Sequence, residues 1–174
     1  MARTILFGIS VSPGVSIGKI SFTHPAGNVE ERRIASEETD TETERLTTAA
    51  AAVRKDLAHA RDEVPDALAE HREVISSHML ICQDPKLLKD ATRRIREERL
   101  CASWALEKTV DALCATFRNM EDPYLRDRAQ DIRAVGLRIQ AKLSGNTPPA
   151  RDHAAPCIHV AEDLSPADTL DLKV

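Results

Sequence analysis

The chain has 174 residues, enough for one medium domain or for one domain with part of a second. Its composition, 42% hydrophobic and 30% charged, is typical of a soluble protein with a buried core, and its formal net charge of -4 argues against general nucleic-acid binding. Aromatic residues make up only 3%. The core must therefore be built from Ala, Leu, Val and Ile, which favours packed helices.

The first 22 residues are apolar but are interrupted by Arg3, Lys19 and three glycines. They have neither the unbroken apolar run of a signal peptide nor the length of a membrane span. The four cysteines are widely spaced and form no C-x-x-C pair. This pattern is typical of small buried side chains in a reducing compartment, rather than of disulfides or a zinc site. We therefore expect a cytoplasmic protein that does not insert into a membrane.

The chain begins with two predicted strands. Apolar residues alternate over residues 5–11, which predicts a half-buried strand. Residues 12–14, Ser-Pro-Gly, predict a turn, and residues 15–22 predict a second strand. Two strands are only marginally stable by themselves. They need a sheet formed by another part of the protein.

Five amphipathic helices follow, each with apolar residues spaced by three or four. The predicted helices begin and end near residues 36–63, 67–82, 85–99, 102–117 and 123–144. Asp84 and Asp122 each precede a proline and mark two of these starts, because Asp accepts from free backbone amides and Pro is tolerated at the first helical position. Gly145 is placed to end the last helix in the left-handed conformation.

A linker with two prolines covers residues 146–155, after which residues 157–161 predict a strand and residues 163–166 a turn into a new helix. Strands on both sides of a helical segment indicate an insertion. The predicted fold class is therefore mainly α, with a helical bundle over residues 24–146 inserted into an α/β domain. That domain would supply strands from residues 1–23 and 147–174, and it looks incomplete at the end of the chain.

Few residues indicate chemistry. The sequence has no P-loop, dinucleotide fingerprint, H-E-x-x-H pair or G-x-S-x-G turn. Arg126, Arg128 and Arg133 are spaced to contact a phosphate. They alternate with Asp127 and Asp131, however, which favours ion pairing on the helix surface.

His78 is the histidine of most interest, since the apolar residues Leu80 and Ile81 follow it just before the helix start at Asp84. Exposed at a corner, this segment would anchor a protein interface. Alternatively, His78 packs at the edge of the core with one ring nitrogen bonded to a backbone carbonyl. Residues 30–70 contain 12 acidic and 6 basic residues, which indicates either a solvated helix face or a surface that attracts a basic partner.

Four segments, in this order along the chain, resemble enzyme I of the bacterial phosphoenolpyruvate:sugar phosphotransferase system. They are residues 8–19 (GISVSPGVSIGK), 78–84 (HMLICQD), 121–133 (EDPYLRDRAQDIR) and 160–169 (VAEDLSPADT). The third is the most specific. Together the segments span nearly the whole chain.

This resemblance implies a helical domain that docks the small phosphocarrier HPr, inserted into a phosphohistidine domain. In that family a phosphoryl group passes from phosphoenolpyruvate to a histidine of the enzyme and then to a histidine of HPr. Leu80 and Ile81 would be apolar anchors, and Glu70 and Asp84 would face basic carrier residues. The full set of implied partner-binding residues is Glu70, His78, Leu80, Ile81, Asp84, Lys86, Phe117, Leu125 and Arg128.

The family's phosphorylated histidine lies in a Gly-Gly-x-x-(Ser/Ala)-His-type segment, which this sequence lacks. The resemblance therefore implies no catalytic residue and no metal or cofactor in this chain, which should dock the carrier without catalysing. Magnesium, and a homodimer formed through a C-terminal domain, are expected only for the full-length parent. Two alternatives stay open: the same scaffold in a nitrogen-regulatory phosphotransfer branch, and a non-catalytic helical interaction module.

Overall fold

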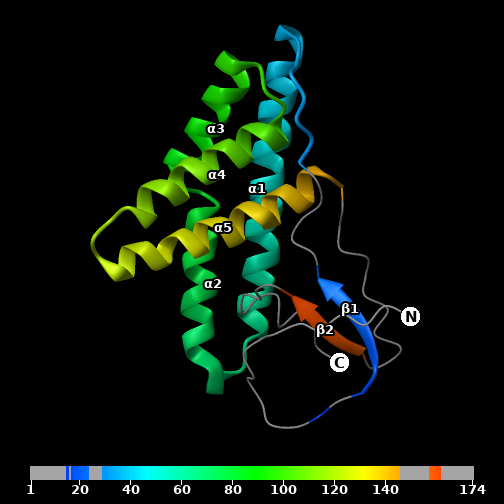
Figure 1. The fold of residues 1–174 in the computed structure, drawn as a ribbon, viewed down its shortest axis with the longest axis vertical. Coiled ribbons are helices and arrows are strands. Elements are labelled where there is room, and N and C mark those ends of the chain that lie inside the picture. The colour runs from blue at the N-terminus through cyan, green and yellow to red at the C-terminus, as the bar shows by residue number, and fades with distance from the viewer. Residues whose placement is uncertain (1–14, 16, 24–28, 146–156, 162–174) are drawn as a thin grey trace.

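The computed structural model describes residues 15, 17–23, 29–145 and 157–161, and most of them form a helical bundle (Figure 1). The strand predicted over residues 5–11 and the turn predicted over residues 163–166 lie outside the described residues. The helices are α1 (Thr39–Glu63), α2 (Ala69–Ile81), α3 (Pro85–Glu98), α4 (Ala102–Arg118) and α5 (Pro123–Leu143). The mainly helical class is thereby confirmed. Short 3-10 helices, Ser36–Glu38 and Asp66–Leu68, lead into α1 and α2, so α2 begins two residues later than expected.

The helix boundaries follow from local chemistry. The Asp84 carboxylate accepts from the backbone amides of Lys86 and Leu87, at 2.7 and 3.3 Å, and satisfies two donors that the first turn of α3 leaves free. Asp122 accepts from the amide of Tyr124 at 2.9 Å at the start of α5. After α5, Gly145 has a φ of 65°, the left-handed conformation that glycine adopts without steric cost. These three predictions from the sequence are confirmed.

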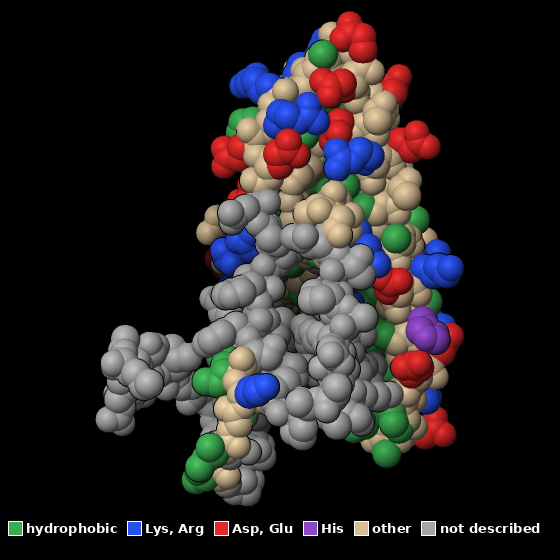
Figure 2. Space-filling view, turned by 90° about the vertical axis from the view of Figure 1, so that its right-hand side faces the viewer, with side chains coloured by type: hydrophobic (Ala, Val, Ile, Leu, Met, Phe, Trp, Pro, Cys, Tyr) green, Lys and Arg blue, Asp and Glu red, His purple; other side chains and the backbone are tan. Residues whose placement is uncertain are grey.

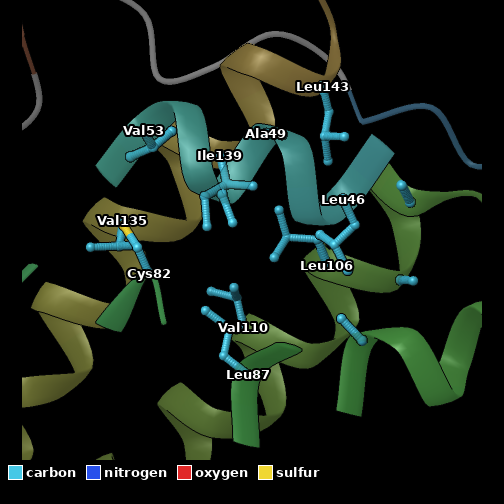
Figure 3. Close-up of a cluster of buried hydrophobic side chains, with 14 of the residues drawn as sticks. Leu46, Ala49, Val53, Cys82, Leu87, Leu106, Val110, Val135, Ile139 and Leu143 are labelled. Carbon is cyan, nitrogen blue, oxygen red and sulfur yellow. The ribbon is translucent and has the colours of Figure 1, made fainter. Parts of the chain in front are cut away.

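The apolar stripes of the helices meet in one core (Figure 3). Side chains from α1, α4 and α5 point toward one another there, and Leu87 enters from α3. The labelled members of the cluster are Leu46, Ala49, Val53, Cys82, Leu87, Leu106, Val110, Val135, Ile139 and Leu143. Small and branched aliphatic side chains fill this core, as the low aromatic content requires.

Helices α4 and α5 are packed closely together at Gly136. A Cβ atom at this position would lie 2.7 Å from Cγ2 and 3.1 Å from Cγ1 of Val110, well inside ordinary contact distance. Glycine therefore allows the two helices to touch. This contact is part of the packing of α5, the helix that carries Arg128, against α4.

Polar contacts join the start of α1 to the end of α5. Arg45, near the start of α1, donates from Nη2 to the carbonyl of Leu143 at 3.1 Å. Glu42, which is only 4% exposed, accepts at 2.7 Å from the amide of Ala102 at the start of α4, and also from Arg45 at 2.5 Å. A buried carboxylate here ties the first turn of α1 to both α4 and the end of α5.

Two short strands, β1 (Lys19–Thr23) and β2 (Cys157–Ala161), pair in parallel beside the bundle (Figure 1). Lys19 aligns with Cys157 and Thr23 with Ala161. The strand predicted to begin at Val15 begins four residues later, because the chain bends at Gly18. Val15 and Ile17 are almost fully exposed. Segments from before and after the helices therefore share one sheet.

The face of the molecule that carries the strands mixes acidic and basic side chains over its upper part (Figure 2). Ion pairs join acids of residues 30–70 to arginines, including Glu38 with Arg32 at 3.0 Å and Asp40 with Arg96 at 3.2 Å. Several acids of the stretch over residues 30–70 are thus neutralised by neighbouring arginines. The charge available to a partner lies on other acids of the stretch.

Candidate functional site

The residues expected to bind a partner lie on α2, at the start of α3, at the end of α4 and near the start of α5. Leu80 is 71% exposed, whereas the other expected anchor, Ile81, is half-buried and packs against the core. Phe117 packs there too. Glu70 is exposed in the first turn of α2, where the helix dipole favours a negative charge. The partner-binding role of all these residues stays a prediction.

His78 joins α2 to α5 from a buried position. It is only 2% exposed, and its Nε2 lies 3.2 Å from Oδ1 of Asp131. An ionised carboxylate only accepts hydrogen bonds, so Nε2 carries the hydrogen in this contact. Among the described residues, the other ring nitrogen, Nδ1, has no hydrogen-bond partner. The alternative of a histidine packed at the edge of the core describes this placement better, although its partner is a carboxylate and not a backbone carbonyl.

Arg128 lies at the surface next to this pair. Its Nη1 donates to Oδ2 of Asp131 at 3.3 Å, and its Nη2 donates to the hydroxyl of Tyr124 at 2.9 Å. The guanidinium carbon is also 5.4 Å from the centre of the Tyr124 ring, in cation–π contact. Tyr124 itself is 64% exposed. Tyr124, Arg128, Asp131 and His78 thus form one connected series, which we term the α5 relay.

The start of α3 presents two more of the expected residues. The carboxylate of Asp84 is used for capping but is exposed, and Lys86 is exposed and pairs with Asp90 at 3.3 Å. Leu125, on α5, is half-buried. Among the described residues, no hydrogen bond or ion pair joins Asp84, Lys86 or Leu125 to the α5 relay. Asp84 and Lys86 lie at the start of α3, and Leu125 directly follows Tyr124 on α5.

Sequence reasoning did not select Tyr124 or Asp131 as site residues. Tyr124 lies four residues before Arg128 and Asp131 three residues after it, so all three share one face of α5. This spacing could have indicated their contacts from the sequence. The predicted ion pairing along the helix surface is confirmed for Arg128 with Asp131. Arg133 pairs instead with Asp111 of α4, at 2.9 Å.

Other kinds of site find little support in the described part of the chain. There, no three His, Cys, Asp or Glu side chains are grouped in a way that could hold a metal ion. Within the same residues, no helix is long and apolar enough to cross a bilayer. Burial raises the pKa of the Cys82 thiol to about 11 and also raises the pKa of Cys114. These thiols are poor nucleophiles in the folded chain.

Relatives with known names match almost the entire chain. A phosphoenolpyruvate-protein phosphotransferase from Cupriavidus necator is 37% identical over 180 residues, which cover 97% of this chain and 31% of the relative. The chain therefore spans about a third of that relative's length.

Two solved structures of enzyme I proteins also match most of this chain. A solution structure of enzyme I has a TM-score of 0.74 at 25% identity, and covers 92% of this chain and 66% of that chain. A structure described as the N-terminal domain of the nitrogen enzyme I has a TM-score of 0.70 at 25% identity, over 91% and 65% of the two chains.

A family model described as "PEP-utilising enzyme, N-terminal" matches residues 7–128, well over half of the chain. This range includes four of the five α-helices completely, together with the first residues of α5. The chain therefore belongs to the family of N-terminal domains of PEP-utilising enzymes.

Proposed function

We propose that this chain is the part of a phosphotransferase-system enzyme I that docks an HPr-type phosphocarrier protein. The exposed side chain of Leu80, on a helix that the α5 relay joins to α5, is the observation that carries this proposal. Leu68 and Val74, on or just before the same helix, are exposed as well, and exposed apolar side chains that lie together mark protein interfaces. Tyr124 provides a second exposed, amphipathic contact.

The charges around these anchors suit a basic partner. Glu70 and Asp84 are exposed, and Glu70 makes no ion pair with any described residue. Their carboxylates would face basic side chains of the carrier, while Lys86 and Arg128 would contact its acceptor groups. Complementary charge speeds encounter and is screened by salt. The affinity for the carrier should therefore fall as salt is raised.

The phosphoryl donor in this scheme is a histidine outside this chain. The inserted bundle would hold the carrier while an α/β phosphohistidine domain, to which β1 and β2 belong, presents that histidine. Magnesium and dimerisation are properties expected of the longer parent. The 174-residue chain alone should take no label from radiolabelled phosphoenolpyruvate, and incorporation of label would show that a phosphorylated group lies within it.

Titration of an isotope-labelled HPr-type carrier with the chain tests the docking proposal. We expect saturable shifts in the carrier spectrum, with an affinity that decreases between about 0.05 M and about 0.5 M NaCl. Leu80→Lys should weaken binding by about tenfold or more, because it puts a charge on the apolar anchor. Thr48→Lys, which adds the same charge at an exposed position of α1, is the matched control. Absence of shifts at any salt concentration would refute the proposal.

The nitrogen-regulatory branch is a second candidate, and the fold similarity to the nitrogen enzyme I structure supports it. The two branches would differ in the carrier that binds. Parallel titrations with the sugar-branch and the nitrogen-branch carriers of the same organism distinguish them, because the physiological partner should bind at least about tenfold more tightly.

A further inference from the structure

We propose that Asp131 is a positioning residue of the docking surface, which holds Arg128 in place for an oxygen acceptor of the carrier. This inference rests on the proposed function and identifies how one part of the surface is organised. It starts from the α5 relay, in which each oxygen of the Asp131 carboxylate has its own partner. Oδ1 is bonded to His78 behind the surface, and Oδ2 is bonded to Arg128 at the surface.

The buried end of the relay explains why a histidine occupies position 78. His78 is enclosed, and its Nδ1 has no partner in the described part of the chain, which costs free energy that an aliphatic residue of similar size would not lose. What the histidine supplies is a donor at Nε2, fixed by the packing of α2 against α5. That donor restrains the Asp131 carboxylate, so the carboxylate cannot follow Arg128 into solvent.

The exposed end of the relay restrains the guanidinium. Arg128 is held from one side by Asp131, at 3.3 Å, and from the other by the Tyr124 hydroxyl, at 2.9 Å. A guanidinium has five N–H donors, and two of them are used in these bonds. Because these two bonds hold the guanidinium in place, its remaining N–H groups already point in fixed directions. Binding an acceptor therefore costs less side-chain entropy than it would with a free arginine.

The acceptor is a carbonyl or carboxylate oxygen of the carrier. A planar guanidinium pairs best with such planar oxygen groups. Arg128 is thereby a specificity contact in a surface that also carries the exposed acids Glu70 and Asp84 and the exposed base Lys86. Asp131 acts through Arg128 and need not touch the carrier itself, whereas the exposed Tyr124 both restrains Arg128 and offers its ring to the carrier.

A double-mutant cycle on carrier binding tests the proposal. The probe is the unphosphorylated HPr-type carrier of the same organism, titrated by calorimetry against the whole 174-residue chain. We expect Asp131→Asn to weaken binding by about 5–10-fold and Tyr124→Phe by about 2–5-fold. In an Arg128→Gln background, both substitutions should lose nearly all of this effect. Glu98→Gln, which breaks the similar Arg94–Glu98 pair on α3 at 2.8 Å, is the control.

Nuclear magnetic resonance of the His78 ring provides a second measurement. The wild-type ring should be the Nε2–H tautomer, and Asp131→Ala should abolish that preference. If the wild-type chain fails to bind the carrier, the proposed function itself is wrong. If it binds, and the effects of Asp131→Asn and Arg128→Gln on affinity are additive, or Asp131→Asn has none, the positioning role is refuted while docking stands. A loss of thermal stability without coupling in affinity also refutes it.

Discussion

Replacement of Gly136 by alanine tests how α5 is held against α4. The added Cβ would lie 2.7 and 3.1 Å from the two methyl carbons of Val110, so the helices must separate or Val110 must leave its rotamer. Overpacking of this kind costs about 1–3 kcal/mol. Alanine in place of glycine inside a helix returns about 0.5–1 kcal/mol. We therefore expect Gly136→Ala to lower the free energy of unfolding by about 1–2 kcal/mol.

Urea unfolding followed by far-ultraviolet circular dichroism measures this loss. Ala141→Gly, at a half-buried position of the same helix, calibrates the propensity difference and should cost about 0.5–1 kcal/mol. Val110→Ala removes the two methyl groups that clash, so the double variant should be more stable than additivity predicts by about 1 kcal/mol or more. If Gly136→Ala stabilises the chain by the full propensity difference, or if the cycle is additive, the helices are not in contact at this position.

Three further predictions concern buried or partly buried groups. Glu42→Gln should lower the free energy of unfolding by about 2–3 kcal/mol in the same urea assay, because it weakens the bonds to Arg45 and to the amide of Ala102; Glu44→Gln, exposed on the same helix, should change it by less than about 0.5 kcal/mol. Burial, with the nearby charges of Asp111 and Glu31, raises the pKa of Glu107. The folded state therefore favours the protonated form, and ionisation of Glu107 as the pH rises removes stability. Glu107→Gln should raise the melting temperature by about 1–2 °C near pH 7, with water screening part of the effect. The difference between the two proteins should vanish in acid, where both side chains are neutral. A difference that persists in acid would mean that charge is not the cause. Because burial raises the pKa of Cys82 to about 11, its alkylation at about pH 8 should be at least about 100-fold slower than that of an unhindered thiol. Peptide mass mapping measures the rate, and rapid native alkylation of Cys82 would contradict its burial.

The helices were predictable because their determinants are local. Asp84 and Asp122 cap the helices that they precede, and the spacing of apolar residues identifies the buried faces without knowledge of the partners. The start of β1 was placed too early, since the apolar residues Val15 and Ile17 suit a strand but remain exposed before the bend at Gly18. Pattern alone does not show where a strand finds its partner.

The surface was predictable only in part. Leu80 was identified from its apolar position just before Asp84 and from the family resemblance, and it is exposed, but the burial of His78 depends on how α2 packs against α5. Asp131 lies 53 residues beyond His78 in the chain, and no periodicity relates the two. The contact between Tyr124 and Arg128, in contrast, is set by one helical turn and was accessible to sequence reasoning. Local pairs could be predicted, whereas pairs between helices could not.

The pairing of β1 with β2 has a consequence for the order of folding. Cys157 follows its partner Lys19 by roughly 140 residues, and closing a loop of that length in an unfolded chain is entropically costly and slow. The bond between Arg45 and the Leu143 carbonyl, however, brings the start of α1 next to the end of α5. Once the bundle has formed, it holds the chain segments before α1 and after α5 near each other, so only short segments remain to be closed between β1 and β2. The helices should form first and the sheet last, so the sheet depends for its formation on the bundle that interrupts it.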